Sequence, residues 1–230
     1  MLLEVIATTL KEAIDIESSG ADRIELVTGI KEGGLTPSIG LIEKIVNSVK
    51  IPVMVMVRPH SKSFVYDNND LEVIIEDIKR IRLTNAYGIV FGALTKDNQI
   101  DEEVLKKVID AKGNLSLTFH RAIDRSRDLI ESMNILKNYD IDRILTSAGS
   151  DSVVDSIELL SQMNEIAIKN DIILLAGSGL NITNIKDFVT KANVSEVHFG
   201  SGVKFDNNNF KEIDSEKIKV VKEIIKWRKK

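Results

Sequence analysis

The sequence predicts an α/β fold, a single (β/α)8 TIM barrel over residues 1–230, and three observations indicate this class. Eight short apolar runs of strand length recur at intervals of about 20 to 35 residues. Longer charged segments with helical periodicity separate these runs, as expected for parallel βα units. The length suits one barrel, and no Ser- or Gly-rich linker marks a second domain.

The expected strands begin at Leu2 and end at Phe199. Between the third and fourth runs, apolar residues recur at helical spacing from Leu71 to Ile81, and after the eighth run the polar stretch 206–209 precedes a C-terminal helix. An open doubly wound sheet is the alternative, but the tripeptide Ala-Thr-Thr at 7–9 stands where its glycine-rich loop would follow the first strand. The eight expected strands are residues 2–6, 23–27, 53–57, 87–91, 115–119, 143–146, 172–176 and 196–199.

Composition excludes several kinds of partner. A net charge of −4 and a pI near 5.5 give no attraction for phosphate backbones, so we expect no nucleic-acid partner. No segment approaches the ~18 apolar residues of a membrane span, and no basic region precedes the first apolar stretch, so we expect no membrane association and a cytoplasmic location. The absence of cysteine excludes disulfides, thiolate nucleophiles and cysteine metal sites.

Strand parity directs ionisable side chains into the mouth of the expected barrel, where the chemistry of this fold takes place. In the fifth run, Leu117 and Phe119 share the face that helices would cover, so His120 is expected to point inward. A buried ion pair, such as Arg23 with Glu25 or Glu196, is the alternative interpretation for each charged residue. The same alternation of faces directs these further residues inward: Glu4, Glu25, Arg58 and His198.

Acid–base chemistry is the catalytic class that the residues leave open. No lysine ends the fifth, sixth or seventh run, which disfavours a Schiff-base aldolase. No His-x-His ends the first run, and neither a Gly-x-Ser-x-Gly elbow nor a Walker loop occurs. We therefore predict Glu25, His120 and Asp124 as the catalytic residues.

Two glycine-bearing turns follow the last two strands, at the usual phosphate site of this fold. Glycines there allow backbone N–H groups to surround an anion, and two arginines are expected at the same rim. The alternative for either segment is a turn that needs glycine only for its backbone conformation and binds no anion. The predicted anion-binding residues are Arg58, Arg121, Gly177, Ser178, Gly179, Gly200, Ser201 and Gly202.

A hard divalent-metal site is a further hypothesis for the mouth. Carboxylate and imidazole ligands suit manganese or zinc better than copper(I). The ligands that the sequence offers for such a site are Glu4, Glu25, His120 and His198.

Five strings of residues resemble the CutC family from about Leu3 to Gly202. They are Gly-Gly-Leu-Thr-Pro-Ser at 33–38, Arg-Pro at 58–59, Thr-Phe-His-Arg-Ala at 118–122, Leu-Thr-Ser at 145–147 and Ala-Gly-Ser-Gly at 176–179. In the first string we expect Thr36 to cap a helix that starts at Pro37. The resemblance implies a cytoplasmic (β/α)8 barrel with a role in copper tolerance or copper handling, copper as a possible ligand, and oligomers, for which we predict a homodimer.

The chain departs from the family pattern in its metal-binding chemistry. It has no cysteine, which weakens direct copper binding, and His60 replaces the second arginine of the family's Arg-Pro-Arg. Met54 and Met56 are the remaining soft ligands near the mouth, and methionines in a barrel strand commonly fill the core. Copper handling, an enzyme acting on a small anionic or phosphorylated metabolite, and a divalent-metal site therefore stand as three hypotheses of function.

Overall fold

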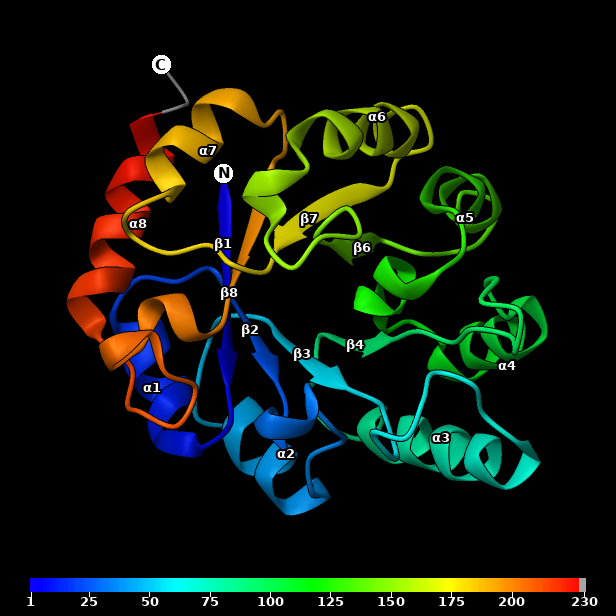
Figure 1. Ribbon diagram of the computed structural model, residues 1–230. Coiled ribbons are helices and arrows are strands. Elements are labelled where there is room, and N and C mark those ends of the chain that lie inside the picture. The colour runs from blue at the N-terminus through cyan, green and yellow to red at the C-terminus, as the bar shows by residue number, and fades with distance from the viewer. Residues whose placement is uncertain (228–230) are drawn as a thin grey trace.

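Eight parallel strands form a closed barrel in which each strand pairs with the next and β8 pairs with β1 (Figure 1). The computed structural model describes residues 1–227. The predicted fold class is confirmed, and the strand ends differ from the predicted ones by no more than one residue. The strands are β1 (Leu2–Ala7), β2 (Arg23–Leu26), β3 (Val53–Met56), β4 (Gly88–Phe91), β5 (Ser116–Phe119), β6 (Arg143–Thr146), β7 (Ile173–Gly177) and β8 (Glu196–Phe199).

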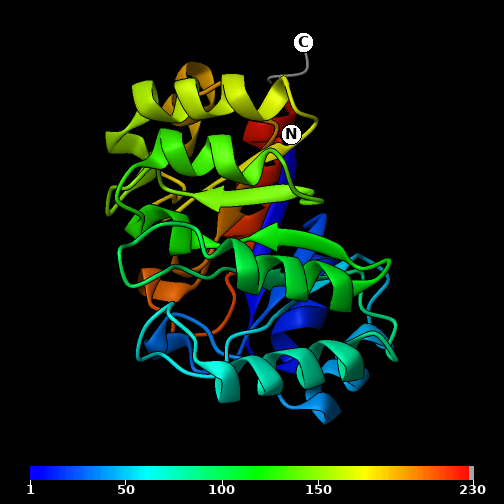
Figure 2. The ribbon, with the colours of Figure 1, turned by 90° about the vertical axis from the view of Figure 1, so that its right-hand side faces the viewer.

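Helices surround the barrel in sequence order, so that α8 returns to lie beside α1 (Figure 1). Figure 2 shows α3 to α6 following one another along one side of the molecule. Within residues 1–227, no helix is both long and apolar enough to cross a membrane. The helices are α1 (Leu10–Ser18), α2 (Ile39–Val46), α3 (Asn68–Ile81), α4 (Glu102–Lys112), α5 (Leu129–Leu136), α6 (Ile157–Ile168), α7 (Ile185–Lys191) and α8 (Ser215–Trp227).

Helix α3 shows how the sequence determines one of these elements. The Asp67 side chain accepts a hydrogen bond from the N–H of Asp70 at 2.9 Å, and the Asp70 side chain accepts one from the N–H of Asp67 at 3.1 Å. This capping box fixes the start of the helix. The predicted apolar stripe then turns toward the strands, with Leu71, Ile74 and Ile78 buried.

The start of α2 differs from the prediction. Ser38, not Thr36, is the N-cap, and its side chain accepts a hydrogen bond from the N–H of Leu41. Thr36 does not cap the helix because it forms hydrogen bonds with Arg58, which follows β3. Its hydroxyl accepts from the N–H of Arg58 at 2.9 Å, and its own N–H donates to the Arg58 carbonyl at 3.0 Å. The loop after β2 is thereby tied to the residue that follows β3.

The barrel interior holds a group of charged residues at the amino ends of the strands and a separate small apolar cluster. In the charged group, Arg23 bridges Glu4 and Glu196, and the Arg143 Nε donates to Glu196 at 3.2 Å. The ion pair of Arg23 with Glu196, one alternative from the sequence, is therefore present. A small apolar cluster is formed by Val27, Met54, Met56 and Val90, and Met56 of this cluster also lines the cavity at the mouth.

Candidate functional site

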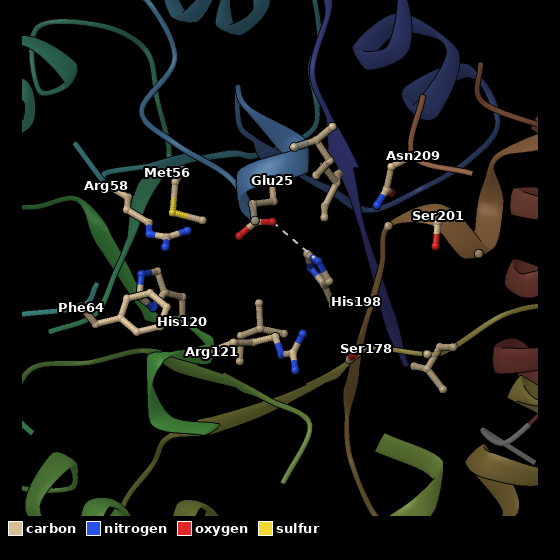
Figure 3. Close-up of a pocket in the computed structure, with 18 residues that line it drawn as sticks. Glu25, Met56, Arg58, Phe64, His120, Arg121, Ser178, His198, Ser201 and Asn209 are labelled. Carbon is tan, nitrogen blue, oxygen red and sulfur yellow. Dashed lines mark ion pairs between the residues drawn. The ribbon is translucent and has the colours of Figure 1, made fainter. Parts of the chain in front are cut away.

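A cavity of about 260 Å³ lies at the carboxyl ends of the strands and opens at the mouth of the barrel (Figure 3). In Figure 3, Glu25 and His198 lie between two groups of residues, Arg58, Phe64 and His120 on one side and Ser178, Ser201 and Asn209 on the other. Ten of the predicted site residues line this cavity: Glu25, Arg58, His120, Arg121, Ser178, Gly179, His198, Gly200, Ser201 and Gly202.

Glu4, His198 and Glu25 form a chain of ionisable groups that leads to the cavity. Glu4 Oε1 lies 2.8 Å from His198 Nδ1, and His198 Nε2 lies 3.6 Å from Glu25 Oε2. Glu4 is held from behind by Arg23. Among the described residues, the second oxygen of Glu25, Oε1, is buried without a hydrogen-bond partner. This series of ionisable groups therefore ends at Glu25 Oε1, a carboxyl oxygen without a hydrogen-bond partner among the described residues.

The pKa values of the three groups differ because their neighbours differ. Burial acts to raise the pKa of Glu4, but Arg23 and His198 outweigh it and bring the pKa to about 2. Burial raises the pKa of Glu25 to about 7 against the attraction of His198. Burial acts to lower the pKa of His198, but the carboxylates of Glu25 and Glu4 raise it above its ordinary value. Near neutral pH, Glu4 is therefore ionised, and Glu25, with a pKa of about 7, is present in both its protonated and its ionised form.

His120 is held in one orientation at the end of β5. Its Nδ1 accepts a hydrogen bond from the N–H of Ala122 at 3.1 Å, and its ring packs 5.1 Å from the Phe64 ring. Burial, together with the charge of Arg58, lowers the pKa of His120 to about 3. Its Nε2 is buried and finds no hydrogen-bond partner within residues 1–227. His120 is thus a neutral imidazole on the cavity wall.

Arg58 is fixed by neutral partners. One terminal nitrogen donates to the carbonyls of Glu32 at 2.9 Å and Gly34 at 3.2 Å, and the guanidinium carbon lies 4.7 Å from the centre of the Phe64 ring. None of these contacts neutralises the positive charge, so it stays available to an anion. The Nε of Arg58 is also buried without a hydrogen-bond partner in the described part of the chain.

Arg121 borders the cavity, while Asp124 lies behind it. Asp124 accepts hydrogen bonds from the Arg121 Nε at 2.8 Å, the Thr146 hydroxyl at 2.5 Å and the Ser147 hydroxyl at 2.9 Å. A carboxylate that accepts this many hydrogen bonds stabilises the local structure, and Asp124 lies outside the cavity lining. The predicted catalytic residue Asp124 is therefore a positioning residue that holds Arg121 at the rim.

The glycine turns bring the loops after β7 and β8 together. A Cβ on Gly179 would lie 2.0 Å from the Ser152 hydroxyl, and one on Gly202 would lie 2.0 Å from the Leu180 carbonyl. Because glycine has no side chain, these residues and Gly200 line the cavity with backbone atoms. Ser178 adopts a φ of +79°, which is strained for a residue other than glycine. Gly177 lies below the lining and leaves room for His198.

The four residues predicted as divalent-metal ligands do not form a joint ligand set. Glu4 is bound to Arg23 and His198, and His120 uses its Nδ1 to accept the Ala122 N–H. Among residues 1–227, no three His, Asp or Glu side chains are placed to hold a metal ion. In residues 1–227, Glu4, Glu25, His120 and His198 are therefore not brought together as metal ligands.

Sequence reasoning missed the apolar and amide residues of the wall. Phe64, which contacts both Arg58 and His120, comes from the loop after β3, and its spacing gives no periodic signal. Asn209 lies in the polar stretch expected only to be a loose connection. It lines the cavity because the buried Lys204 holds its carbonyl at 3.1 Å. Only the fold reveals such contacts between loops.

The fold and the site define a (β/α)8 barrel whose mouth is lined by ionisable residues, two arginines among them. Comparison with known proteins assigns its family. The chain belongs to the CutC family, whose model matches residues 1–203. The copper homeostasis protein cutC homologs of Homo sapiens and Mus musculus are each 36% identical over 214 residues, which covers 90% of this chain and 78% of each homolog. The resemblance predicted from the five sequence strings is confirmed.

One solved structure supports the same assignment, and a second shows the same fold. A CutC crystal structure from Streptococcus agalactiae matches with a TM-score of 0.81 and 29% identity, over 86% of this chain and 97% of that one. Phosphoribosyl anthranilate isomerase from Thermotoga maritima matches with a TM-score of 0.66 and 16% identity, over 99% of each chain. The second likeness shows the fold alone.

Proposed function

We propose that the mouth cavity binds a small anionic or phosphorylated metabolite and transfers protons on it. The observation that carries this proposal is that three residues lining one cavity each have a buried polar atom without a hydrogen-bond partner among the described residues: Glu25 (Oε1), Arg58 (Nε) and His120 (Nε2). A buried polar atom left unpaired costs about 1–3 kcal/mol, so such atoms normally pair with protein, ordered water or a ligand, and these three line a cavity that a ligand can enter.

The charges around the cavity favour an anion. Arg58 and Arg121 both line it, Arg121 in an ion pair with Asp124, and the loops after β7 and β8 line it with Ser178 and Ser201 (Figure 3). Arg58 has only neutral partners, which leaves its charge uncompensated until a ligand arrives. Guanidinium groups bind phosphate and carboxylate through charge-assisted hydrogen bonds.

Glu25 is the residue suited to move protons. A general base works best when its pKa lies near the working pH, and burial brings the pKa of Glu25 to about 7. His198, oriented by Glu4, lies beside it and can take up or return a proton. His198 and Glu4 act through Glu25, so both are positioning residues.

The homologs named copper homeostasis proteins support the same physiological role for this chain. Copper(I) prefers thiolate and thioether ligands, whereas this chain has no cysteine. Met56 contributes a thioether to the described cavity wall, and Met54 is buried against Gly88 instead. This donor set does not fit a tight copper(I) site. We therefore propose that the protein affects copper tolerance through the metabolite it binds, as a cytoplasmic homodimer.

Thermal melting with inorganic phosphate tests this function. At a concentration about 100-fold above Kd, phosphate would add about 2.7 kcal/mol to stability, which raises the Tm of a chain of this size by about 5–10 °C. Arg58→Ala should abolish that shift, and Arg58→Lys should retain part of it. Without phosphate, Arg58→Ala loses two hydrogen bonds and a cation–π contact, about 2 kcal/mol in all.

The control is Arg127→Ala, which removes the same charge from an arginine that pairs with Glu131 outside the cavity lining. It should keep the full phosphate response. Equal phosphate shifts in Arg58→Ala and the parent protein would overturn the proposed site. So would a parent protein whose Tm responds to neither phosphate nor sugar phosphates at millimolar concentration.

A further inference from the structure

We infer that His120 serves the ligand as a neutral hydrogen-bond donor to a carbonyl oxygen, so that the substrate is a small phosphorylated or carboxylated carbonyl compound. This inference rests on the proposed anion-binding function and specifies its chemistry. It separates the role of His120 from that of Glu25, because only Glu25 gains and loses a proton.

The hydrogen bond to Ala122 determines where the His120 proton lies. The N–H of Ala122 donates to His120 Nδ1 at 3.1 Å, so Nδ1 carries a lone pair. A neutral imidazole must then carry its proton on Nε2. Nε2 is the buried atom without a partner among residues 1–227, and His120 lines the cavity. The free group is therefore an N–H donor, which pairs with an oxygen acceptor such as a carbonyl or enolate.

The surroundings of the ring keep it neutral and in place. Burial disfavours a second proton on the ring, and the positive charge of Arg58 beside it disfavours that proton further, so the pKa of His120 falls to about 3. Phe64 packs on one side of the ring, 5.1 Å between ring centres. On another side lies Gly92, where a Cβ would come within 2.5 Å of Nδ1. Gly92 is thus a positioning residue for His120.

Glu25 and His120 border the same cavity from β2 and β5, which suits removal of a proton next to a carbonyl group. Glu25 takes the proton, the electron pair of the broken C–H bond forms a C=C bond, and the carbonyl π pair moves onto oxygen. His120 Nε2–H donates a hydrogen bond to that oxyanion and keeps its own proton. Return of a proton from Glu25 to carbon restores the carbonyl, so hydrogen exchange at this carbon needs no co-reactant.

Two small phosphates test the donor. 2-Phosphoglycolate carries an oxyanion where an enolate oxygen would lie, and glycerol 3-phosphate carries a hydroxyl instead. The parent protein should bind 2-phosphoglycolate more tightly. His120→Leu should reduce that preference about 10- to 100-fold, the effect of losing one hydrogen bond to a charged acceptor, whereas His120→Gln keeps an N–H donor and should retain most of it.

His60→Gln is the matched control, because His60 lies at the same end of the barrel, pairs with Asp70 at 3.1 Å and lies outside the cavity lining. It should leave the preference unchanged. If the parent protein binds neither phosphate, the anion site itself is refuted. If it binds both and His120→Leu keeps the full preference, the anion site stands and the role of His120 is refuted.

Nitrogen NMR of the parent protein tests the same inference without a ligand or a variant. His120 should show a protonated Nε2 and an unprotonated Nδ1, unchanged between about pH 5 and 8, the range in which an ordinary histidine changes charge. A protonated Nδ1, or a ring that becomes cationic within this range, would overturn the inference.

Discussion

Replacing Glu25 by glutamine should stabilise the protein at alkaline pH. The pKa of Glu25 rises from its ordinary value of 4.5 to about 7, so the folded state favours the protonated carboxyl. The corresponding stability is fully present below about pH 4.5 and is lost as the pH rises through about 7. At about 1.4 kcal/mol per pKa unit, the loss is about 3 kcal/mol. Glu25 is only 4% exposed, so solvent screens little of this cost.

Glutamine has nearly the shape of the protonated carboxyl and carries no charge at any pH. Glu25→Gln should therefore match the parent protein near pH 4.5 and exceed its stability by about 3 kcal/mol near pH 8.5. Glu4 and Arg23 keep their ion pair in both proteins, whereas His198 loses in the variant the Glu25 carboxylate that raises its pKa. Urea denaturation at the two pH values measures the difference, provided that the m-values agree.

The opposite result has a clear physical meaning. A variant that is less stable than the parent protein at pH 8.5 would show that Glu25 is a structural partner of His198. The reasoning that a costly carboxyl is retained for proton transfer would then be wrong.

Three further predictions concern copper, assembly and the barrel interior. Without cysteine, the purified protein should bind copper(I) no more tightly than about micromolar, a free energy of about −8 kcal/mol, and sub-nanomolar affinity at one site in a competition titration would contradict this. Light scattering should give about twice the chain mass of 25.6 kDa, and a mass near 25.6 kDa would rule out the dimer. Arg23→Met should cost about 3–5 kcal/mol in urea denaturation because the buried Glu4 keeps only His198 and the buried Glu196 keeps only Arg143 as a charged partner, and a loss below about 1 kcal/mol would contradict that role.

Strand positions and strand faces were predictable from the sequence because alternation has a fixed period. That is why Glu25, Arg58, His120 and His198 were all expected at the mouth, where they line one cavity. Alternation along a strand predicts which face of the sheet a residue lies on, but it predicts neither the level of the residue along the barrel axis nor the side chains that it contacts. It could not distinguish Glu4, which is held by Arg23 at the amino ends of the strands, from Glu25 one strand away.

Contacts between loops could not be predicted from the sequence. Asp124 looked like a free carboxylate, and only the fold brings Thr146 and Ser147 to it. Thr36 looked like a helix cap because the residue that binds it, Arg58, is distant in the sequence. Phe64 gave no signal, since its role depends on two side chains from other strand ends.

A crystal structure of the protein grown with millimolar phosphate tests the central claim most directly. We predict an anion in the mouth cavity, within hydrogen-bond reach of Arg58 and bordered by Arg121 and the backbone of the glycine turns. Such an anion would give Arg58 Nε the partner that it lacks among the described residues. A well-ordered mouth that holds only water at that phosphate concentration, with Arg58 bound as before to Glu32 and Gly34, would contradict the account.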